Sequence, residues 1–414
     1  MRGHIVAATV TAVLLASTGC GPALPGPAAA TTVFIATDLP LQGDDTATSQ
    51  ETNQAIQLYL EQAGGKAGAF PVELRLYDDA STIRKSWDPE TCVKNAHDHV
   101  VGDEVAVIGT YNSGCARLMV PIMNDGSEGP LTMVSHANSN PGLTKAWGRG
   151  EPQKFYPGGK RSFARVAASD DQSSLASAAF VSGTLKRKRC YVLNDGQVYG
   201  KGLATAFVAA AGKYGIRVLG NDVWDVGKTS YTSLFRKIEA RDPDCVVVAG
   251  DYTNNGKQII LDKVAVLGSN RRVTMMAPGF SGYADMAALP QADGMYLAFG
   301  GLSRQQMTAD SPAAAKFVAA YSARFGAEPA TVYSLYGVAA VQVVLAAIAA
   351  SDGTRAGVHQ ALFGATDLTV PATESITGQA LTIDHSTGDL TSNTITISVV
   401  RGGKETFLSS TRVS

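Results

Sequence analysis

VAVIGTYNSGCARLMVPIMNDGSEGPLTMVS, residues 105–135, holds the pattern that decides the fold. It opens with an apolar run at 105–109, continues through a helix-like segment at 118–124 and closes with a second strand-like run at 131–135. Two short apolar runs separated by a helix are typical of a βαβ unit, in which the connecting helix covers two parallel strands. The stretch therefore predicts a parallel sheet with helices packed on it.

The same alternation extends in both directions along the chain. It pauses at a Gly/Pro/charged stretch, 147–160, and restarts beyond it, which indicates a second βαβ lobe. The C-terminus differs, because its strands are joined by turns. The expected strands are 33–36, 72–77, 105–109, 131–135, 189–194, 217–224, 245–249, 381–384, 394–399 and 404–408, and the expected helices are 54–63, 89–101, 118–124, 172–185, 202–214, 230–241 and 312–324. We predict an α/β protein with two doubly wound parallel-sheet lobes.

Length and composition fit that prediction. The 414 residues are enough for two domains with their own cores, and 45% apolar with 17% charged residues is the composition of a globular chain. The formal net charge of −1 gives no indication of a nucleic-acid partner. The dense basic run at 186–189 precedes a strand-like segment, and we interpret it as a solvated loop.

The N-terminus carries the features of an export signal. Arg2 supplies a positive charge, and the apolar segment 5–16 is too short to remain as a membrane span. Small residues lead to Cys20, a pattern that resembles a bacterial lipobox with Ser17 where leucine is usual. We expect residues 1–20 to be a lipoprotein signal peptide and 21–31 a Gly/Pro/Ala-rich tether. Cys20 would then anchor the exported protein at the outer face of the bacterial cytoplasmic membrane or in the periplasm. Cleavage near residues 28–30, with loss of Cys20, is the alternative.

Four further cysteines fit an oxidising compartment. Cys92 and Cys115 lie near each other in sequence, whereas Cys190 and Cys245 each begin a predicted strand. Neighbouring parallel strands would bring those two starts together, so we predict the disulfides Cys92–Cys115 and Cys190–Cys245. A zinc site is the alternative, but the sequence has no CxxC pair or Cys/His cluster, and we expect no metal.

Residues 333–350 form an uncharged, largely apolar stretch long enough to suggest a membrane span. Gly337 and Gln342 interrupt it, and a span at this place would cut the βα pattern in two. We predict a buried core helix.

The sequence completes none of the catalytic or phosphate-binding motifs that it partly matches. The Gly-rich segments 196–202 and 250–258 do not fit GxxxxGK[ST], and Tyr283 replaces the last glycine of a nucleophile elbow at 279–283. The acidic pairs at 44–45 and 170–171 are merely adjacent in sequence, which is no evidence of a converging acid and base. We therefore expect neither an enzyme nor a cofactor.

Several landmarks combine in a recognisable order: YDDA at 77–80, VIGTYNSG at 107–114, SHANSNPGLT at 135–144, DDQ at 170–172, YGKGL at 199–203 and GDY at 250–252. In this order and spacing they resemble the type I periplasmic solute-binding proteins, most closely the leucine/isoleucine/valine-binding receptors of ABC transporters. The resemblance implies two lobes joined by three crossover strands, lobe one at 32–164 plus 300–378 and lobe two at 165–299 plus 379–414. It also implies a monomer that traps a small molecule and meets ABC permease and ATPase subunits.

The resemblance further implies an α-amino acid site. Ser113 matches a serine after the third strand, and Ala137 and Ser139 match positions after the fourth strand that meet the ligand carboxylate and amine. Strand ends followed by helix N-termini offer free N–H groups to an anion, which supports the serines on physical grounds. Helix capping is their alternative role.

Other candidates come from the second lobe and the loops. Tyr199 and Tyr252 match lobe-two tyrosines, with cleft-edge packing as the alternative, and Asp170 matches an acidic position at the crossing. His136 either contacts the ligand or orders its loop, and Gln42 in the first loop is a further candidate.

One position departs from the family pattern. The family usually places an acidic residue at the end of a lobe-two strand to pair with the ligand ammonium, and the aligned residue here is Gly279. A buried ammonium without a carboxylate is costly. Either Asp251 or Asp170 substitutes for it, or the ligand lacks an amine.

The expected function is capture of an amino acid or a related small carboxylate or amide by hinge closure, for delivery to an ABC importer. The alternative is a ligand-sensing receptor lipoprotein coupled to a signalling partner.

Overall fold

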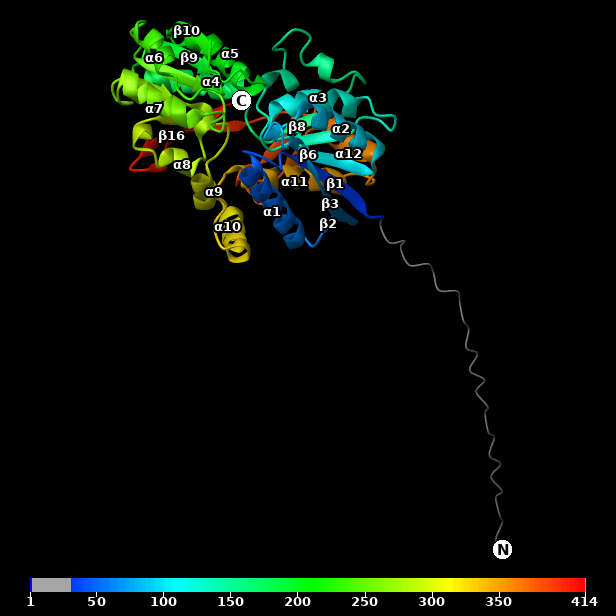
Figure 1. Ribbon diagram of the computed structural model, residues 1–414. Helices are drawn as coiled ribbons and strands as arrows, with labels where there is room; N and C mark the ends of the chain where they lie inside the picture. Colours follow the sequence, from blue (N-terminus) through cyan, green and yellow to red (C-terminus); the bar gives the residue numbers. More distant parts are fainter. Residues whose placement is uncertain (2–30, 414) are drawn as a thin grey trace. The chain divides into compact units, whose positions relative to one another are not determined.

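A computed structural model describes Met1 and residues 31–413, and the chain from Thr31 onward forms one compact unit (Figure 1). The predicted signal peptide, Cys20 and nearly all of the tether lie outside the described residues. Two large sheets organise this unit, and the first is built from residues before 166.

The first sheet has the order β2-β3-β1-β6-β7-β8. Its parallel strands are β1 (Val33–Leu39), β3 (Phe70–Asp78), β6 (Glu104–Gly109), β7 (Thr132–Ser135) and β8 (Phe163–Arg165), with the short antiparallel β2 (Lys66–Ala67) at one edge. Alternate side chains of β1 enter different cores, Ile35 on one face and Ala36 on the other. Burial on both faces explains why these strands are continuous apolar runs in the sequence.

The second sheet has the order β10-β9-β11-β12-β13-β16-β17. Its parallel strands are β9 (Arg189–Asn194), β10 (Arg217–Val223), β11 (Cys245–Ala249), β12 (Thr274–Met276) and β13 (Tyr296–Phe299). The C-terminal hairpin of β16 (Asn393–Arg401) and β17 (Lys404–Val413) extends it antiparallel to β13. Both sheets therefore share one doubly wound order for their five parallel strands, and the predicted fold class is confirmed.

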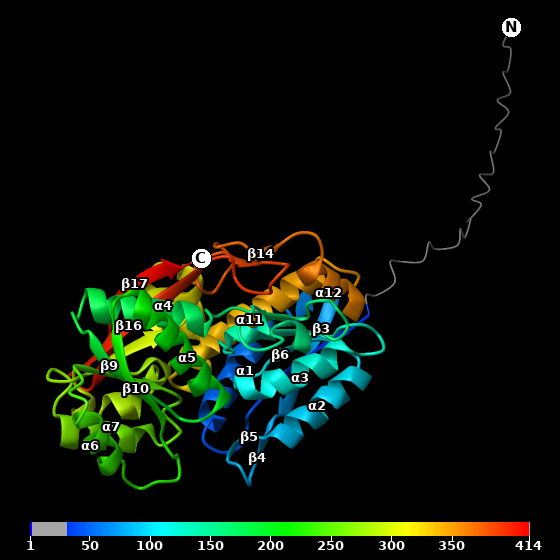
Figure 2. The ribbon, with the colours of Figure 1, turned by 90° about the horizontal axis from the view of Figure 1, so that it is seen from above.

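Helices cover both faces of the sheets. They are α1 (Thr46–Gln62), α2 (Pro89–Val101), α3 (Ser113–Asn124), α4 (Asp170–Gly183), α5 (Val198–Lys213), α6 (Thr232–Glu239), α7 (Gly256–Leu267), α8 (Ala284–Ala287), α9 (Arg304–Asp310), α10 (Pro312–Phe325), α11 (Tyr333–Ala349) and α12 (Arg355–Phe363). Figure 2 shows α1–α3, α11 and α12 grouped with the first sheet and α4–α7 with the second. We call these two groups lobe one and lobe two.

The chain passes between the two lobes three times. The passages follow β8, β13 and the small antiparallel pair of β14 (Leu368–Val370) and β15 (Leu381–Ile383). Leu381 and Ile383 of β15 are buried in the core of lobe one. The structure thus places β15 with lobe one, although residues 379–414 were assigned to lobe two from the sequence.

Helix α11 corresponds to the ambiguous apolar stretch. Nearly all of its residues are buried, and it packs against α1 in the core of lobe one, as predicted. Within the described part of the chain, no helix combines the length and apolar character needed to cross a membrane.

Both predicted disulfides are present. Cys92–Cys115 joins α2 to α3, with the two Cα atoms 5.6 Å apart. Cys190 and Cys245 are direct neighbours in the register of β9 and β11, with their Cα atoms 4.5 Å apart. The argument from adjacent strand starts is confirmed.

Candidate functional site

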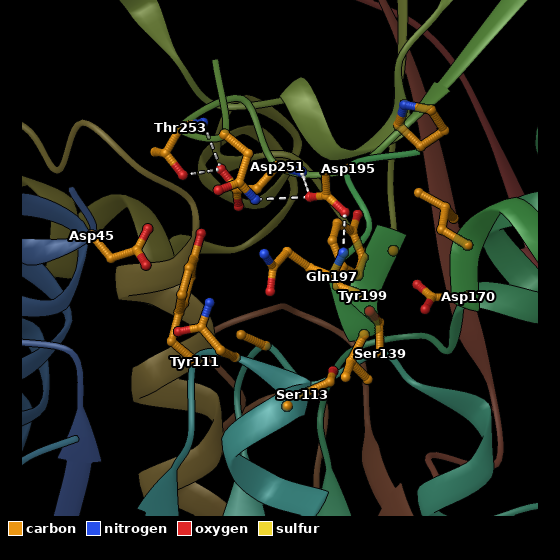
Figure 3. Close-up of a pocket in the computed structure, with 18 of the residues that line it drawn as sticks. Asp45, Tyr111, Ser113, Ser139, Asp170, Asp195, Gln197, Tyr199, Asp251 and Thr253 are labelled. Carbon is orange, nitrogen blue, oxygen red and sulfur yellow. Dashed lines mark hydrogen bonds between the residues drawn. The ribbon is translucent and has the colours of Figure 1, made fainter. Parts of the chain in front are cut away.

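A cavity of about 250 Å³ lies where the carboxyl ends of strands from both sheets converge (Figure 3). Lobe one contributes loops that follow β1, β6 and β7, and lobe two contributes loops that follow β9 and β11. In a doubly wound sheet, the crevice forms where connections from adjacent strands leave toward opposite faces, here between β1 and β6 and between β9 and β11. The fold itself therefore places a small-molecule site at this position, and the volume lies just below the range usual for drug-sized ligands, which fits a small solute.

The N-terminus of α3 supplies a positive dipole end to the cavity. Asn112, Ser113 and Gly114 line the cavity, and the N-cap residue Asn112 makes no side-chain cap. A Cβ at Gly114 would stand 2.3 Å from the ring of Trp87, so only glycine fits this close packing. Uncapped N–H groups at the start of a twelve-residue helix favour a carboxylate.

Asp170 is the first residue of α4 and faces the same cavity. Asp170 is only 2% exposed, and its Oδ2 atom has no hydrogen-bond partner among the residues that the structure describes. Burial raises the pKa of Asp170 to about 8, and a hydrogen bond from Ser139 offsets this only in part. Among the described residues Asp170 has no ion-pair partner, and the nearby charge of Arg165 lowers its pKa only in part, so an ionised Asp170 would be stabilised by a cation in the cavity.

Two more carboxylates belong to opposite lobes. Asp45 precedes α1 in lobe one and is 4% exposed, and burial followed by the charge of Asp251 raises its pKa to about 7. Asp251 follows β11 in lobe two, and burial raises its pKa as well. The Tyr283 hydroxyl donates a hydrogen bond of 2.9 Å to Asp251 Oδ1.

Aromatic side chains close the Asp45 end of the cavity. The rings of Tyr111 and Tyr333 meet edge to face with their centroids 5.1 Å apart. His136 lies next to them, with ring centroids 6.2 Å from Tyr111 and 6.3 Å from Tyr333. It is 1% exposed, burial lowers its pKa to about 3, and neither ring nitrogen has a partner in the described region.

The structure brings five of the eight predicted ligand residues to this cavity: Ser113, Ala137, Ser139, Asp170 and Tyr199. The other three lie elsewhere.

Tyr252, Gln42 and His136 are absent from the described lining of the cavity. Tyr252 donates a hydrogen bond to Asp285 Oδ2 at 2.9 Å and lines a neighbouring cavity, because its ring packs on Phe280 and Tyr283. Gln42 instead donates to Asp78 Oδ2 at 2.6 Å. His136 stands behind the aromatic wall.

Other lining residues were not identified from the sequence. Asp45, Trp87, Tyr111, Asp195 and Tyr333 belong to this group. Asp195 and Tyr111 follow strand ends, so the rule that identified Ser113 could have found them. Tyr333 is the first residue of α11, more than two hundred residues after Ser113 in the chain, and its position depends on how α11 packs.

Gly279 is fixed by its neighbours. A Cβ at this position would lie 2.1 Å from the carbonyl oxygen of Gly250 and 2.9 Å from the Tyr199 hydroxyl. The backbone of one loop and the Tyr199 ring therefore occupy the space that an acidic side chain would need. Asp170 and Asp251, the two residues expected to replace the missing acidic partner of a ligand ammonium, both line the cavity.

Metal-ligand groups among the described residues lie away from this cavity. Two of them combine an aspartate with cysteines that are already joined in disulfides, and these sulfurs are not free thiolates. The third, Asp367, Asp384 and His385, is partly exposed, and no ion is needed to explain it.

Comparison with known proteins adds independent findings. The family model described as periplasmic binding protein matches residues 32–402. A Leu/Ile/Val-binding protein of Rhizobium johnstonii is 28% identical over 401 residues, which cover 96% of this chain and 98% of that protein.

Solved structures match over most of the chain. A branched-chain amino acid transporter substrate-binding protein of Streptococcus pneumoniae in complex with isoleucine superposes with a TM-score of 0.73 at 19% identity, covering 92% of this chain and 99% of the other. A solute-binding protein of an ABC transporter from R. palustris in complex with benzoate also gives 0.73 at 19% identity, with 92% and 96% covered. At these identities the likeness demonstrates a shared fold.

Proposed function

The chain belongs to the periplasmic binding protein family, and from this premise we propose that it is the exported receptor of an ABC importer for an amino acid or a related small solute. The predicted resemblance to the Leu/Ile/Val-binding branch is confirmed by the relatives that match most of the chain. These relatives are named as substrate-binding proteins, and the family implies an exported, periplasmic location.

One observation carries the ligand class: the cavity combines an uncapped helix N-terminus with a buried carboxylate that lacks a cation. An α-amino acid presents the two matching groups. Its carboxylate would accept hydrogen bonds from N–H groups near Ser113, Ala137 and Ser139. Its ammonium would pair with Asp170 beside Tyr199. An aromatic carboxylate, as bound by the R. palustris protein, would leave Asp170 without a partner.

Capture would follow from the two-lobed arrangement. Because both lobes line the cavity, a bound solute makes contacts in the closed form that an open form lacks. The closed form would then be the one that the permease and ATPase subunits of the importer receive.

A lipid on Cys20 would hold the receptor at the membrane while residues 21–31 act as a tether. Mass spectrometry of the mature N-terminus tests this part of the proposal. A diacylglyceryl-modified Cys20 is expected, and an unmodified start beyond Cys20 would refute the anchor.

A thermal-shift screen tests the ligand class, because a ligand that binds the native state raises the melting temperature by mass action. The chain from residue 31 would be screened with amino acids, amides, aliphatic carboxylates and benzoates. We expect stabilisation by at least one amino acid. Stabilisation by carboxylates that lack an amine, with no response to any amino acid, would contradict the proposal. Ser113→Ala should weaken binding of the responding ligand, and Ser322→Ala on α10, outside the cavity, is the matched control.

A further inference from the structure

The cavity holds more carboxyl groups than one ammonium requires. Its charged lining residues are Arg84 and the aspartates 45, 170, 195 and 251. The Arg84 side chain is 57% exposed and already pairs with Asp88 at 3.2 Å, so its charge is partly neutralised outside the set of cavity aspartates. A cavity lined by several carboxyl groups favours a ligand with more than one positive charge, because each carboxyl group ionises more readily beside a cation.

Asp195 is already engaged by three donors of its own lobe. Its two oxygens accept hydrogen bonds from the backbone N–H groups of Gln197 and Asp251 and from the Asn254 amide, at 3.0, 3.1 and 2.8 Å. These bonds order the loops after β9 and β11. Three aspartates therefore remain for recognition: Asp45, Asp170 and Asp251.

These three aspartates form two separate acidic ends. Figure 3 shows Asp45 and Asp170 at opposite ends of the cavity. The electrostatics agree, because Asp251 acts on the carboxyl of Asp45, whereas the carboxyl of Asp170 responds to Arg165 and Asp171. A ligand ammonium at Asp170 would leave the opposite end unpaired.

The second end has free acceptor atoms. The three hydrogen bonds that the structure gives the Asp251 carboxylate all reach Oδ1, two from Thr253 and one from Tyr283. Asp45 receives a long hydrogen bond, 3.4 Å from Ser86 Oγ, and a further one from the Asn112 side chain, and neither restores its ordinary pKa. Oδ2 of Asp251 and the Asp45 carboxylate are therefore available to a donor in the cavity.

Closure also depends on this end. Asp45 belongs to lobe one and Asp251 to lobe two, so closure brings the two carboxyl groups together, and they repel each other when both are ionised. A cation between them would turn the repulsion into an attraction to both lobes. The aromatic rings of Tyr111 and Tyr333 line the cavity beside it, and aromatic rings can attract an ammonium or guanidinium group.

We propose that the captured solute is a cationic amino acid, whose positively charged side chain binds between Asp45 of lobe one and Asp251 of lobe two while its α-ammonium binds Asp170. This inference rests on the proposed function and adds the substrate class. The α-carboxylate faces the N-terminus of α3 and the loop that contains Ala137 and Ser139.

Calorimetric titration of the chain from residue 31 at pH 8 tests the substrate class with matched ligand pairs. L-lysine is compared with L-norleucine, and L-arginine with L-citrulline, because each pair has a similar shape and differs in charge. We expect the cationic member of at least one pair to bind tenfold or more tightly than its neutral match. Cadaverine, which lacks the carboxylate of lysine, should bind at least tenfold more weakly than lysine.

The outcomes separate the two proposals. Equal or tighter binding of the neutral members would overturn the cationic class while leaving an amino acid receptor in place. Binding of cadaverine as tight as that of lysine would overturn the amino acid and indicate a diamine. If neither cationic nor neutral amino acids bind, the proposed function fails together with this inference.

Variants locate the effect at the second end. Asp45→Asn and Asp251→Asn should reduce the preference for the cationic member to about one, while affinity for the neutral member stays within threefold. Asp242 is an exposed residue of lobe two that pairs with Arg189. Asp242→Asn removes the same charge away from the cavity, so it should keep the preference and is the matched control. Because Asp251 also holds Thr253 and Tyr283, Asp45→Asn is decisive if the other variant fails to fold. A preserved preference in Asp45→Asn overturns the assignment.

Discussion

Replacing Asp170 with asparagine should make the empty receptor more stable and its ligand binding weaker. The substitution keeps the size of the side chain and removes the group that burial forces to hold a proton. Wild-type Asp170 has a pKa of about 8 in the folded protein, against an ordinary value of 3.8. The folded state must therefore retain a proton at neutral pH that the unfolded state releases.

The size of the effect follows from linkage. At pH 7, keeping a proton on a carboxyl group with an ordinary pKa of 3.8 costs about 4 kcal/mol. Asparagine avoids this cost but still buries a polar amide, so we expect a net gain of about 2 kcal/mol. For a chain of this length, that gain corresponds to an increase of roughly 2–4 °C in the melting temperature.

The pH dependence is the diagnostic part of the prediction. Because the folded pKa of Asp170 is raised, the folded state binds more protons than the unfolded state between about pH 4 and pH 8. Wild-type stability should therefore fall over this range relative to Asp170→Asn. The variant should be slightly less stable than the wild type at pH 4, where only the cost of the buried amide is left, and its advantage in melting temperature should be largest near pH 8.

Differential scanning calorimetry of the ligand-free protein at pH 4, 5, 6, 7 and 8 measures this difference. Asp171→Asn is the neighbouring control: although burial opposes ionisation there, hydrogen bonds from Ser169 and Lys145 hold the pKa of Asp171 below its usual value. That control should lose stability above pH 4. A stability gain for Asp170→Asn that is independent of pH, or no gain at pH 8, would refute the reasoning.

Three further predictions concern binding, packing and cross-linking. In calorimetric titrations, affinity for a cationic amino acid should increase at least tenfold from pH 6 to pH 8. Asp45 and Asp170 have pKa values of about 7 and about 8 and must lose their protons to pair with the ligand. An affinity that does not change with pH would contradict their role. Gly279→Ala should destabilise the protein by about 2–4 kcal/mol in denaturant unfolding, because the new Cβ would lie 2.1 Å from a carbonyl oxygen. The control Gly212→Ala, whose Cβ meets nothing within 4 Å, should be neutral or stabilising. Equal effects of the two substitutions would show that the contact at Gly279 is not restrictive. Replacing Cys190 and Cys245 together by serine should cost about 4 kcal/mol in the same assay, because the bond closes a loop of 55 residues, and unchanged unfolding would argue against the cross-link.

The sequence predicted the fold well because parallel strands that are buried on both faces appear in it as short, continuous apolar runs. Residues such as Ile108 and Val247 sit in runs that are apolar on both faces of a sheet, and such runs are visible without an alignment. Helix starts were less visible. Helix α1 begins at Thr46 and α3 at Ser113, eight and five residues before the expected starts, because small and polar residues take the place of a clear apolar stripe in their first turns.

The candidate site was partly predictable for a related reason. Residues directly after a strand end, such as Ser113 and Ser139, are placed by the sheet itself, and they line the cavity. Tyr252 also follows a strand end, but its ring turns to the apolar contact offered by Phe280. Asp45 and Tyr333 reach the cavity through the packing of α1 on α11, which sequence spacing alone does not specify.

The hydrogen bonds of the aspartates separate the support of this cleft from its recognition surface. Both oxygens of Asp195 accept hydrogen bonds from three donors of its own lobe, so its carboxylate is largely satisfied before any ligand arrives. Asp170 keeps an oxygen without a partner, and Asp251 directs all three of its hydrogen bonds to Oδ1. Buried carboxylates with unused acceptors destabilise the empty protein, and a cation that reaches them recovers that free energy as binding affinity. The same groups should therefore limit the stability of the free receptor and determine the charge of the solute that it retains.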